Sequence, residues 1–289
     1  MSTVSPAKSI AVLPLLNLSS DPDNEYFSDG MTEEIINALN RINGLKVTAR
    51  TSSFSFKGKE LDVRDIGQKL GVSSVLEGSV RKAGNHLRIS VQLAQVSDGY
   101  QLWSETFDRK LEDVFALQDE ISLLVADKIR ENFGHLEVQD QLVSKATDDV
   151  EAYDLFLKGR EQMLNWTGDG ISQAVDLFKL AIEKDPQFAR AYYELIWSCY
   201  ILSAWKLHPD EALSGTADTY LQRVEKIDKE LPEYHFCLAT RSFWLEWNFN
   251  EANQHIQNAL AINPQYTIVI EGLAELLMAT GNFKEAMNQ

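Results

Sequence analysis

The pattern of apolar positions divides the chain near residue 140, because short strand-like runs precede that point and helical spacing dominates after it. A continuous apolar run over residues 9–18 predicts a strand that is buried on both faces. Residues 72–81 and 87–93 flank a tight turn and predict an antiparallel hairpin with one solvated face. Residues 45–50 and the segment after the Ser97-Asp98-Gly99 turn predict further strands.

Helical spacing interrupts these strands at three places, residues 31–42, 63–70 and 117–133. Gly44 and Gly71 follow the first two of these segments and are expected to end the helices. The resulting order, β-α-β-α-β-β-β-α, predicts an α/β domain in which helices pack on a mixed sheet.

The second half repeats a spacing of small and apolar residues with a period near 34, which is typical of tetratricopeptide repeats. Ala174, Phe178 and Ala181 carry this spacing, and Ala252, Ile256 and Ala259 carry it again. A third set lies between them, at Ala217, Leu221 and Val224, and Ala286 begins a fourth. Gly159 occupies a small position in the first helix of the first unit, where two helices must approach closely. We therefore expect an all-α tetratricopeptide-repeat solenoid of about three and a half units.

Composition and charge exclude several classes of protein. The 44% of apolar residues is ordinary for a globular protein, and 289 residues suggest two domains. The net charge is −16, divided into −5 for residues 1–145 and −11 for residues 146–289. Such a chain is a poor binder of nucleic acid and of anionic membranes, so we expect no direct nucleic-acid contact. No apolar stretch near the start is long enough to span a bilayer, and no secretory pattern is present, which favours a cytoplasmic fragment and leaves a membrane-anchored parent protein open.

The pattern gives the following organisation: an α/β domain over residues 8–135, a linker over 136–150 and repeats over 151–289. The chain stops inside the second helix of the fourth unit, where a solenoid would need a polar capping helix. We therefore expect the chain to be a fragment of a longer protein.

Three segments of the first half are similar to a known family. They read EYFSDGMTEEI (residues 25–35), RTSSFSFKGK (residues 50–59) and GYQLWSETFDR (residues 99–109). In this order they resemble the TolB amino-terminal-like domain of bacterial signalling proteins. Members of that family are joined to adenylate/guanylate cyclase domains, winged-helix regulators or protein kinases, and tetratricopeptide repeats typically follow. The resemblance implies a regulatory or partner-binding α/β domain and supplies no catalytic residues.

No segment of the sequence carries a recognisable catalytic or metal-binding motif. The residues Asp21 to Glu25 begin like a calcium loop, but Tyr26 stands where the sharp turn needs Gly. The chain has no phosphate loop, no His-Glu-x-x-His pair and no nucleophile elbow. Cys199 and Cys237 fall within helices and are interpreted as buried structural thiols. We therefore predict no cofactor, no metal and no enzymatic activity for this chain.

The candidate site is the concave groove that stacked repeats offer to a protein or peptide. Its lining is taken from the second, fifth, ninth and twelfth positions of each first helix, and aromatic and Arg side chains are the usual anchors among such residues. The predicted groove residues are Tyr153, Phe156, Arg160, Arg190, Tyr193, Trp197, Tyr200, Phe236 and Phe243. Packing against neighbouring helices is an equally good interpretation of these aromatic residues.

The hairpin face, with Arg81, Arg88 and Ser90 among its residues, is a second candidate surface, for which a solvated sheet face is the favoured interpretation. Three hypotheses for the function follow. The first is a non-catalytic interaction region of a signalling protein, acting as a scaffold and compatible with a homo-oligomer. The second is a small-molecule-binding enzyme domain, and the third, by fold analogy alone, is an envelope-associated assembly factor.

Overall fold

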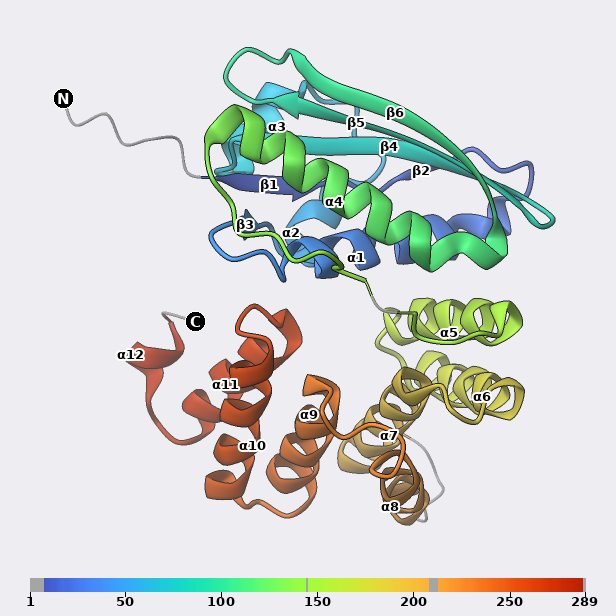
Figure 1. Cartoon of the computed structure of the whole chain (residues 1–289). Coiled ribbons are helices and arrows are strands. Elements are labelled where there is room, and N and C mark those ends of the chain that lie inside the picture. The colour runs from blue at the N-terminus through green and yellow to red at the C-terminus, as the bar shows by residue number, and fades with distance from the viewer. Residues whose placement is uncertain (1–7, 144, 208–212, 288–289) are drawn as a thin grey trace. The chain divides into compact units, whose positions relative to one another are not determined.

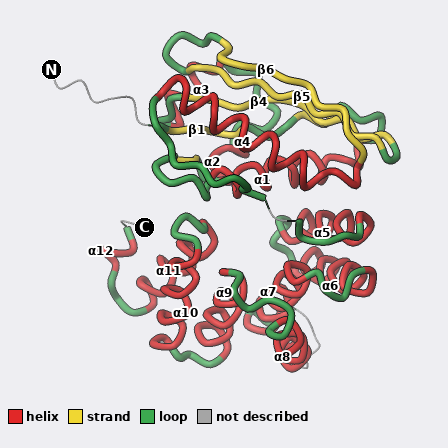
Figure 2. Tube along the Cα trace, viewed as in Figure 1, coloured by secondary structure: helices red, strands yellow, loops and turns green. Residues whose placement is uncertain are grey.

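The computed structural model of the chain describes residues 8–143, 145–207 and 213–287. It divides into two compact units, Met1–Lys145 and Ala146–Gln289. The first unit holds the strands and the second holds only helices, turns and loops in its described part (Figures 1 and 2).

The first unit is built on a mixed six-stranded sheet. β1 (Ser9–Val12) lies between β3 (Lys46–Val47) and β4 (Ser74–Ala83) and is parallel to both. β5 (His86–Gln95) and β6 (Gln101–Lys110) extend the sheet from β4 by antiparallel pairing. The predicted mixed sheet and hairpin are therefore confirmed.

Helices cover the two faces of this sheet unequally (Figure 1). α1 (Glu25–Leu39) and the long α4 (Val114–Phe133) pack against each other along one face. α3 (Val63–Leu70) covers part of the other face, where Ile66 joins a cluster with Val75 and Val96. Gly71 ends α3 in the left-handed region with φ 67°, as its position after the helix predicts.

The strand predicted over residues 9–18 is not continuous. It breaks into β1 and β2 (Leu16–Asn17), which pairs with β4 in parallel, and Leu16 is 59% exposed. Pro14 lies at the break, and a proline has no backbone N–H to give to a sheet. The strand predicted over residues 45–50 is likewise only two residues long, because α2 (Arg50–Phe54) begins at its end.

Residues 136–143, assigned to the linker by the sequence pattern, are fastened to the first unit. Leu136 and Leu142 are buried, with exposed fractions of 2% and 1%. The carboxylate of Asp119 on α4 accepts the backbone N–H groups of Leu142 and Val143 at 2.6 and 2.8 Å, and Arg41 donates to the carbonyl oxygen of Leu142 at 2.9 Å. The segment is therefore a strap that completes the core of this unit.

The second unit consists of helices that pack in consecutive pairs. The first helices of the pairs are α5 (Val150–Met163), α7 (Ala189–Ala204), α9 (Pro232–Thr240) and α11 (Thr267–Ala279). The second helices are α6 (Gly168–Lys184), α8 (Leu213–Val224), α10 (Phe249–Ile262) and the short α12 (Phe283–Ala286).

Each helix contacts its partner, and the pairs contact one another through α6 with α7, α7 with α9 and α10 with α11. The small residues of the repeat pattern lie where helices touch, because Ala174, Ala217, Ala252 and Ala259 are fully buried. Gly159 lies so close to α6 that a Cβ atom there would come within 2.5 Å of the Phe178 ring. The repeat spacing therefore reflects close helix packing.

No helix in the described ranges combines the length and the apolar composition needed to cross a membrane. The expected end inside a fourth second helix involves residues 288–289, which lie outside the described ranges.

Candidate functional site

The first helices of the second unit carry the predicted groove residues, and the structure divides these residues into two groups. Four of the rings are buried, with exposed fractions of 0–2%; they belong to Tyr153, Phe156, Tyr193 and Tyr200. The hydroxyl of Tyr200 donates to Asp218 at 2.8 Å, and that of Tyr193 donates to the carbonyl oxygen of Asp228. Burial raises the pKa of both tyrosines. These four side chains are packing residues in this structure, because they leave almost no surface for a partner.

The other five predicted residues are half-buried, namely Arg160, Arg190, Trp197, Phe236 and Phe243. Trp197 on α7 contacts Phe236 on α9, with ring centroids 5.7 Å apart. Arg160 on α5 approaches Glu194 on α7 at 3.4 Å. Both arginines lie over the buried ring of Phe156, at 5.8 and 5.4 Å from its centroid. Side chains from three successive first helices therefore meet on one side of the unit.

Glu233, which occupies a lining position on α9, and Tyr266, which precedes α11 and occupies none, extend this surface to the fourth pair. Burial raises the pKa of Tyr266, which also senses the negative charges of Glu233 and Glu194 and the positive charges of Arg160 and Arg190. One carboxylate oxygen of Glu233 is buried and has no hydrogen-bond partner among the described residues. We use the name first-helix face for the surface formed by Arg160, Arg190, Glu194, Trp197, Glu233, Phe236 and Tyr266.

Phe243 does not join the first-helix face. It lies in a π-helical turn, Arg241–Leu245, that follows α9, and its ring contacts Trp244 and Phe249. Its place in the fold is with a core cluster shared by α9, α10 and α11. A π turn inserts one extra residue into the helix, so a position count that assumes a regular α-helix fails beyond it.

The first helix of the fourth pair, α11, carries two perturbed carboxyl groups, those of Glu271 and Glu275. Burial raises the pKa of both, and the charge of Glu271 adds to the rise at Glu275. The two residues are one helical turn apart, so they face the same direction. A cation that approached this part of α11 would relieve their repulsion.

Both cysteines are free and buried, as the sequence predicts. Burial raises the pKa of the Cys237 thiol, so it stays protonated, and its Sγ lies 3.5 Å from the carbonyl oxygen of Tyr193. A protonated, buried thiol is a poor nucleophile. In the described ranges, no group of three or more His, Cys, Asp or Glu side chains is arranged to hold a metal ion.

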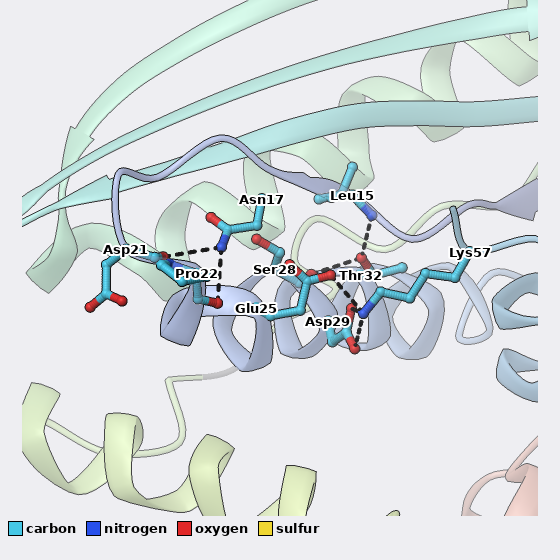
Figure 3. Close-up of polar contacts among 9 residues, drawn as sticks. All are labelled: Leu15, Asn17, Asp21, Pro22, Glu25, Ser28, Asp29, Thr32 and Lys57. Carbon is cyan, nitrogen blue, oxygen red and sulfur yellow. Dashed lines mark hydrogen bonds and ion pairs between the residues drawn. The ribbon is translucent and has the colours of Figure 1, made fainter. Parts of the chain in front are cut away.

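The motif residues of the first unit use their polar atoms to hold the fold together (Figure 3). The ammonium group of Lys57 binds Asp29 at 2.7 Å and Glu25 at 2.8 Å, which ties the segment after α2 to α1. The hydroxyl of Thr32 accepts the N–H of Leu15 at 3.0 Å and donates to the carbonyl oxygen of Ser28 at 2.8 Å. Burial raises the pKa of Asp29, although its hydrogen bond to Lys57 opposes the rise. These contacts indicate that this part of the motif is structural.

The hairpin face is a ladder of pairs between neighbouring strands. Gln92 donates to Glu77, the hydroxyls of Ser90 and Thr106 are 2.9 Å apart, and Arg88 binds Asp108 at 2.7 and 3.1 Å. A cavity of about 450 Å³ lies at the end of this ladder, lined by basic residues together with Asp108 and Asp113. Its cations already have partners, because Arg109 binds Glu120 at 3.0 Å and Lys110 binds Glu112 at 3.1 Å.

Parts of the two units match different family models. Residues 6–124 match the model of the HilA/YgeH-like transcriptional regulator, second domain. Residues 245–289 match a tetratricopeptide repeat. A curated relative from Rhizobium meliloti (strain 1021), named "Putative adenylate cyclase 3", is 37% identical over 243 residues. That alignment covers 83% of this chain and 41% of the relative, so the chain spans less than half of the relative's length.

Solved structures overlap with the chain only in part. TolB from Acinetobacter baumannii is 16% identical and covers 43% of this chain and 29% of its own, with a TM-score of 0.32. The lipoprotein GNA1162 from Neisseria meningitidis is 20% identical and covers 43% of this chain and 96% of its own, with a TM-score of 0.31. TM-scores of this size do not assign a fold.

The family matches confirm the arrangement that the sequence resemblance implies, a TolB-like or regulator-type α/β domain followed by a tetratricopeptide-repeat region. The two matching models describe a regulator domain and a repeat, and neither is a catalytic domain.

Proposed function

We propose that this chain is a non-catalytic interaction and regulatory region of a larger bacterial signalling protein. In this proposal the α/β domain extends from residue 8 through the strap of residues 136–143 and the repeats extend over residues 151–289, and the parent protein is an adenylate/guanylate cyclase or a transcription regulator. The relative from Rhizobium meliloti supports the first kind of parent, and the regulator-type domain match supports the second.

The observation that carries the proposal is the convergence of charged and aromatic side chains on the first-helix face. Four helix pairs contribute to it, because Tyr266 precedes α11 and its hydroxyl senses charges from α5, α7 and α9. Trp197 and Phe236 give this face a half-exposed aromatic centre. Central aromatic residues surrounded by charged groups are the usual anchors of protein interfaces.

The unpartnered oxygen of Glu233 points to the kind of group a partner supplies. A buried carboxylate oxygen without a hydrogen bond costs free energy, and a donor from a bound polypeptide would remove that cost. A backbone N–H of a bound peptide is one such donor. A protein or peptide therefore fits this face better than a small apolar ligand does.

A pull-down with the purified chain tests the proposal. The wild-type chain should recover a protein or peptide, and Trp197→Ala and Arg190→Glu should each reduce its recovery at least tenfold with little change in melting temperature. The matched control is Arg223→Glu on α8, which makes the same charge change outside the first-helix face.

Two results would count against the proposal. One is equal recovery by the wild type and both variants. The other is a large fall in the melting temperature of Trp197→Ala, which would make Trp197 a core residue, since truncating a core tryptophan typically costs ~3–5 kcal/mol.

A further inference from the structure

A chain of six aromatic rings runs along the turns between the first and second helices of three successive pairs. Trp166 follows α5, Trp205 ends α7, and Trp247 lies between the π turn and α10. Trp166 and Trp205 have ring centroids 6.0 Å apart, and Trp205 and Trp244 have centroids 6.1 Å apart. Phe243 and Phe249 continue the contacts from Trp244 to Trp247. We call these six residues the tryptophan ridge.

The tryptophan side chains of the ridge leave much of their surface open to solvent. Trp166 is 48% exposed, Trp205 43% and Trp247 73%. Leu164 and Leu207, next to the ridge in sequence, are 44% and 39% exposed. Large contiguous apolar patches of this kind on a folded chain mark sites of interaction.

Two of the tryptophans also occupy a backbone position that disfavours a large side chain. Trp166 has φ 49° and Trp247 has φ 56°, and each immediately precedes the N-cap of the following second helix. In the fourth pair the corresponding residue is Gly281, with φ 80°. The left-handed region costs a residue with a side chain roughly 1 kcal/mol or more, whereas glycine adopts it freely. Little in the free unit offsets this cost at Trp247, because most of its side chain faces solvent.

The negative charge of the repeat unit indicates which kind of partner can bind to the ridge. The unit has a net charge of −11, so a second copy of the chain or any acidic segment is repelled. Asp169 and Glu246 are exposed and lie close to the ridge in sequence, and Glu246 already binds Arg241 at 2.8 Å. The face of a tryptophan ring is the best aromatic partner for a Lys or Arg side chain. A basic polypeptide segment therefore matches both the exposed tryptophan rings and the negative charge of the unit.

We propose that the tryptophan ridge is a docking site for an arginine- or lysine-rich segment of a partner protein, which lays its cationic side chains over the exposed tryptophan rings. The ridge borders the first-helix face, because the rings of Trp166 and Trp197 have centroids 5.9 Å apart, but the two surfaces share no residue. The peptide test below measures the ridge by itself, because its variants change no residue of the first-helix face.

The test uses the full chain and a short synthetic peptide in which arginine alternates with alanine. The matched peptide carries citrulline, which has nearly the same shape and no charge, in place of arginine. Binding is measured by isothermal titration calorimetry and by the change in tryptophan fluorescence, at two salt concentrations. The wild-type chain should bind the arginine peptide at least tenfold more tightly than the citrulline peptide.

Variants locate the binding. Trp247→Gly and Trp166→Gly place glycine where the backbone favours it, so both should remain folded by thermal melting, and each should weaken binding of the arginine peptide about fivefold or more. Tyr100→Leu is the control, because Tyr100 is an aromatic residue of the first unit that is 74% exposed, and it should leave the affinity unchanged.

Three results overturn the proposal. They are no binding of the arginine peptide, equal binding of the citrulline peptide, and affinities of the two glycine variants equal to that of the wild type. The last result would show that diffuse negative charge, and not the ridge, attracts the peptide.

Discussion

At the scale of single residues, the tryptophans in the turns contribute little to the stability of the free chain, and we therefore connect them with the binding of a partner. Trp247 combines a positive φ of 56° with a ring that is 73% exposed, so it contributes backbone strain and little burial. Backbone strain that packing does not offset is commonly found at functional sites. The strain at Trp247 therefore points to a role in binding.

We predict that Trp247→Gly leaves the free energy of unfolding unchanged or raises it by up to about 1 kcal/mol, because glycine relieves the strain of the left-handed conformation. Denaturant unfolding of both proteins measures the difference. The comparison variant is Phe249→Ala, which removes a half-buried ring of the adjacent core cluster and should lower stability. A loss above about 2 kcal/mol for Trp247→Gly would show that the ring supports the fold.

The repeat spacing predicted which side chains of the first helices belong to the lining, but it could not predict which of them are exposed to solvent. The spacing identified Trp197 and Phe236, which are half-buried and in contact. It also selected Tyr153 and Phe156, whose burial depends on how closely neighbouring helices approach. The tryptophans at residues 166, 205 and 247 carried a signal that could have been found, since each follows a predicted first helix.

At the scale of helices and strands, a small residue fixes the distance between α5 and α6. Gly159 faces Phe178, and an added Cβ would approach that ring to 2.5 Å. Gly215, in the first turn of α8, has no atom within 4 Å of the place where a Cβ would stand. The two glycines therefore allow the same substitution, glycine to alanine, to be compared at a crowded and at an open position.

We predict that Gly159→Ala lowers the free energy of unfolding by roughly 1–3 kcal/mol, because the helices must move apart. Gly215→Ala should raise it by roughly 0.4–1 kcal/mol, because alanine lowers the entropy of the unfolded chain and clashes with nothing. Chemical denaturation of both variants provides the values. Equal effects of the two substitutions would contradict the close packing of α5 on α6.

The pairing of α9 with α10 contains two histidines that face each other. Their Nδ1 atoms are 3.4 Å apart, and their rings are stacked with centroids 5.7 Å apart. Burial lowers the pKa of both side chains, and the nearby charge of His255 lowers the pKa of His235 further. Two protonated rings at this distance would repel each other, so the folded state favours at most one proton on the pair.

We predict that this pair makes the stability of the repeat unit fall as the pH decreases below about 6.5, the ordinary pKa of histidine. The unfolded chain takes up protons there more readily than the folded chain, so acid favours unfolding. Glu271 and Glu275 act in the opposite direction, because their raised pKa values favour the folded state when the carboxyl groups are protonated.

The quantity to measure is therefore the difference in stability between the wild type and a His235→Gln/His255→Gln variant, from unfolding curves between pH 7.5 and 5. The difference should change by the largest amount below pH 6.5. A His86→Gln control alters an exposed turn at the start of β5 and should show no such change. A pH-independent difference would contradict the role of the pair.

Strand lengths were harder to predict than strand existence. The hairpin of β4 and β5 matches its alternating pattern, because one face is covered and the other carries polar cross-strand pairs. The first strand was overestimated because its apolar residues continue past Pro14. α2 was missed because its five residues carry no helical period that a pattern could detect.

At the scale of the whole molecule, the chain consists of two compact units, and the extent of the first differs from the domain that its composition indicates. The segment after α4 lacks an apolar period, which made it appear as a linker. Leu136 and Leu142 nevertheless complete the first core, and the carboxylate of Asp119 on α4 accepts the backbone N–H groups of Leu142 and Val143. Such a strap has no local sequence signal, because its conformation depends on contacts with residues far away in the chain.

We predict that a fragment ending at residue 145 is more stable than one ending at residue 135. The shorter fragment loses two buried leucines, each worth roughly 1.5–3 kcal/mol of burial. Thermal melting of the two fragments gives the comparison. Equal melting temperatures would show that residues 136–143 do not stabilise the first unit and act only as a linker.

Photo-crosslinking from a benzoylphenylalanine placed at single positions in cells shows whether the repeat unit contacts a partner through its first-helix face. Position 236 lies on the first-helix face, position 222 is exposed on α8, and position 104 is exposed on the open face of β6. We predict a discrete protein adduct from position 236 and none from positions 222 and 104. An adduct from position 104 alone, or none from position 236, would contradict this prediction.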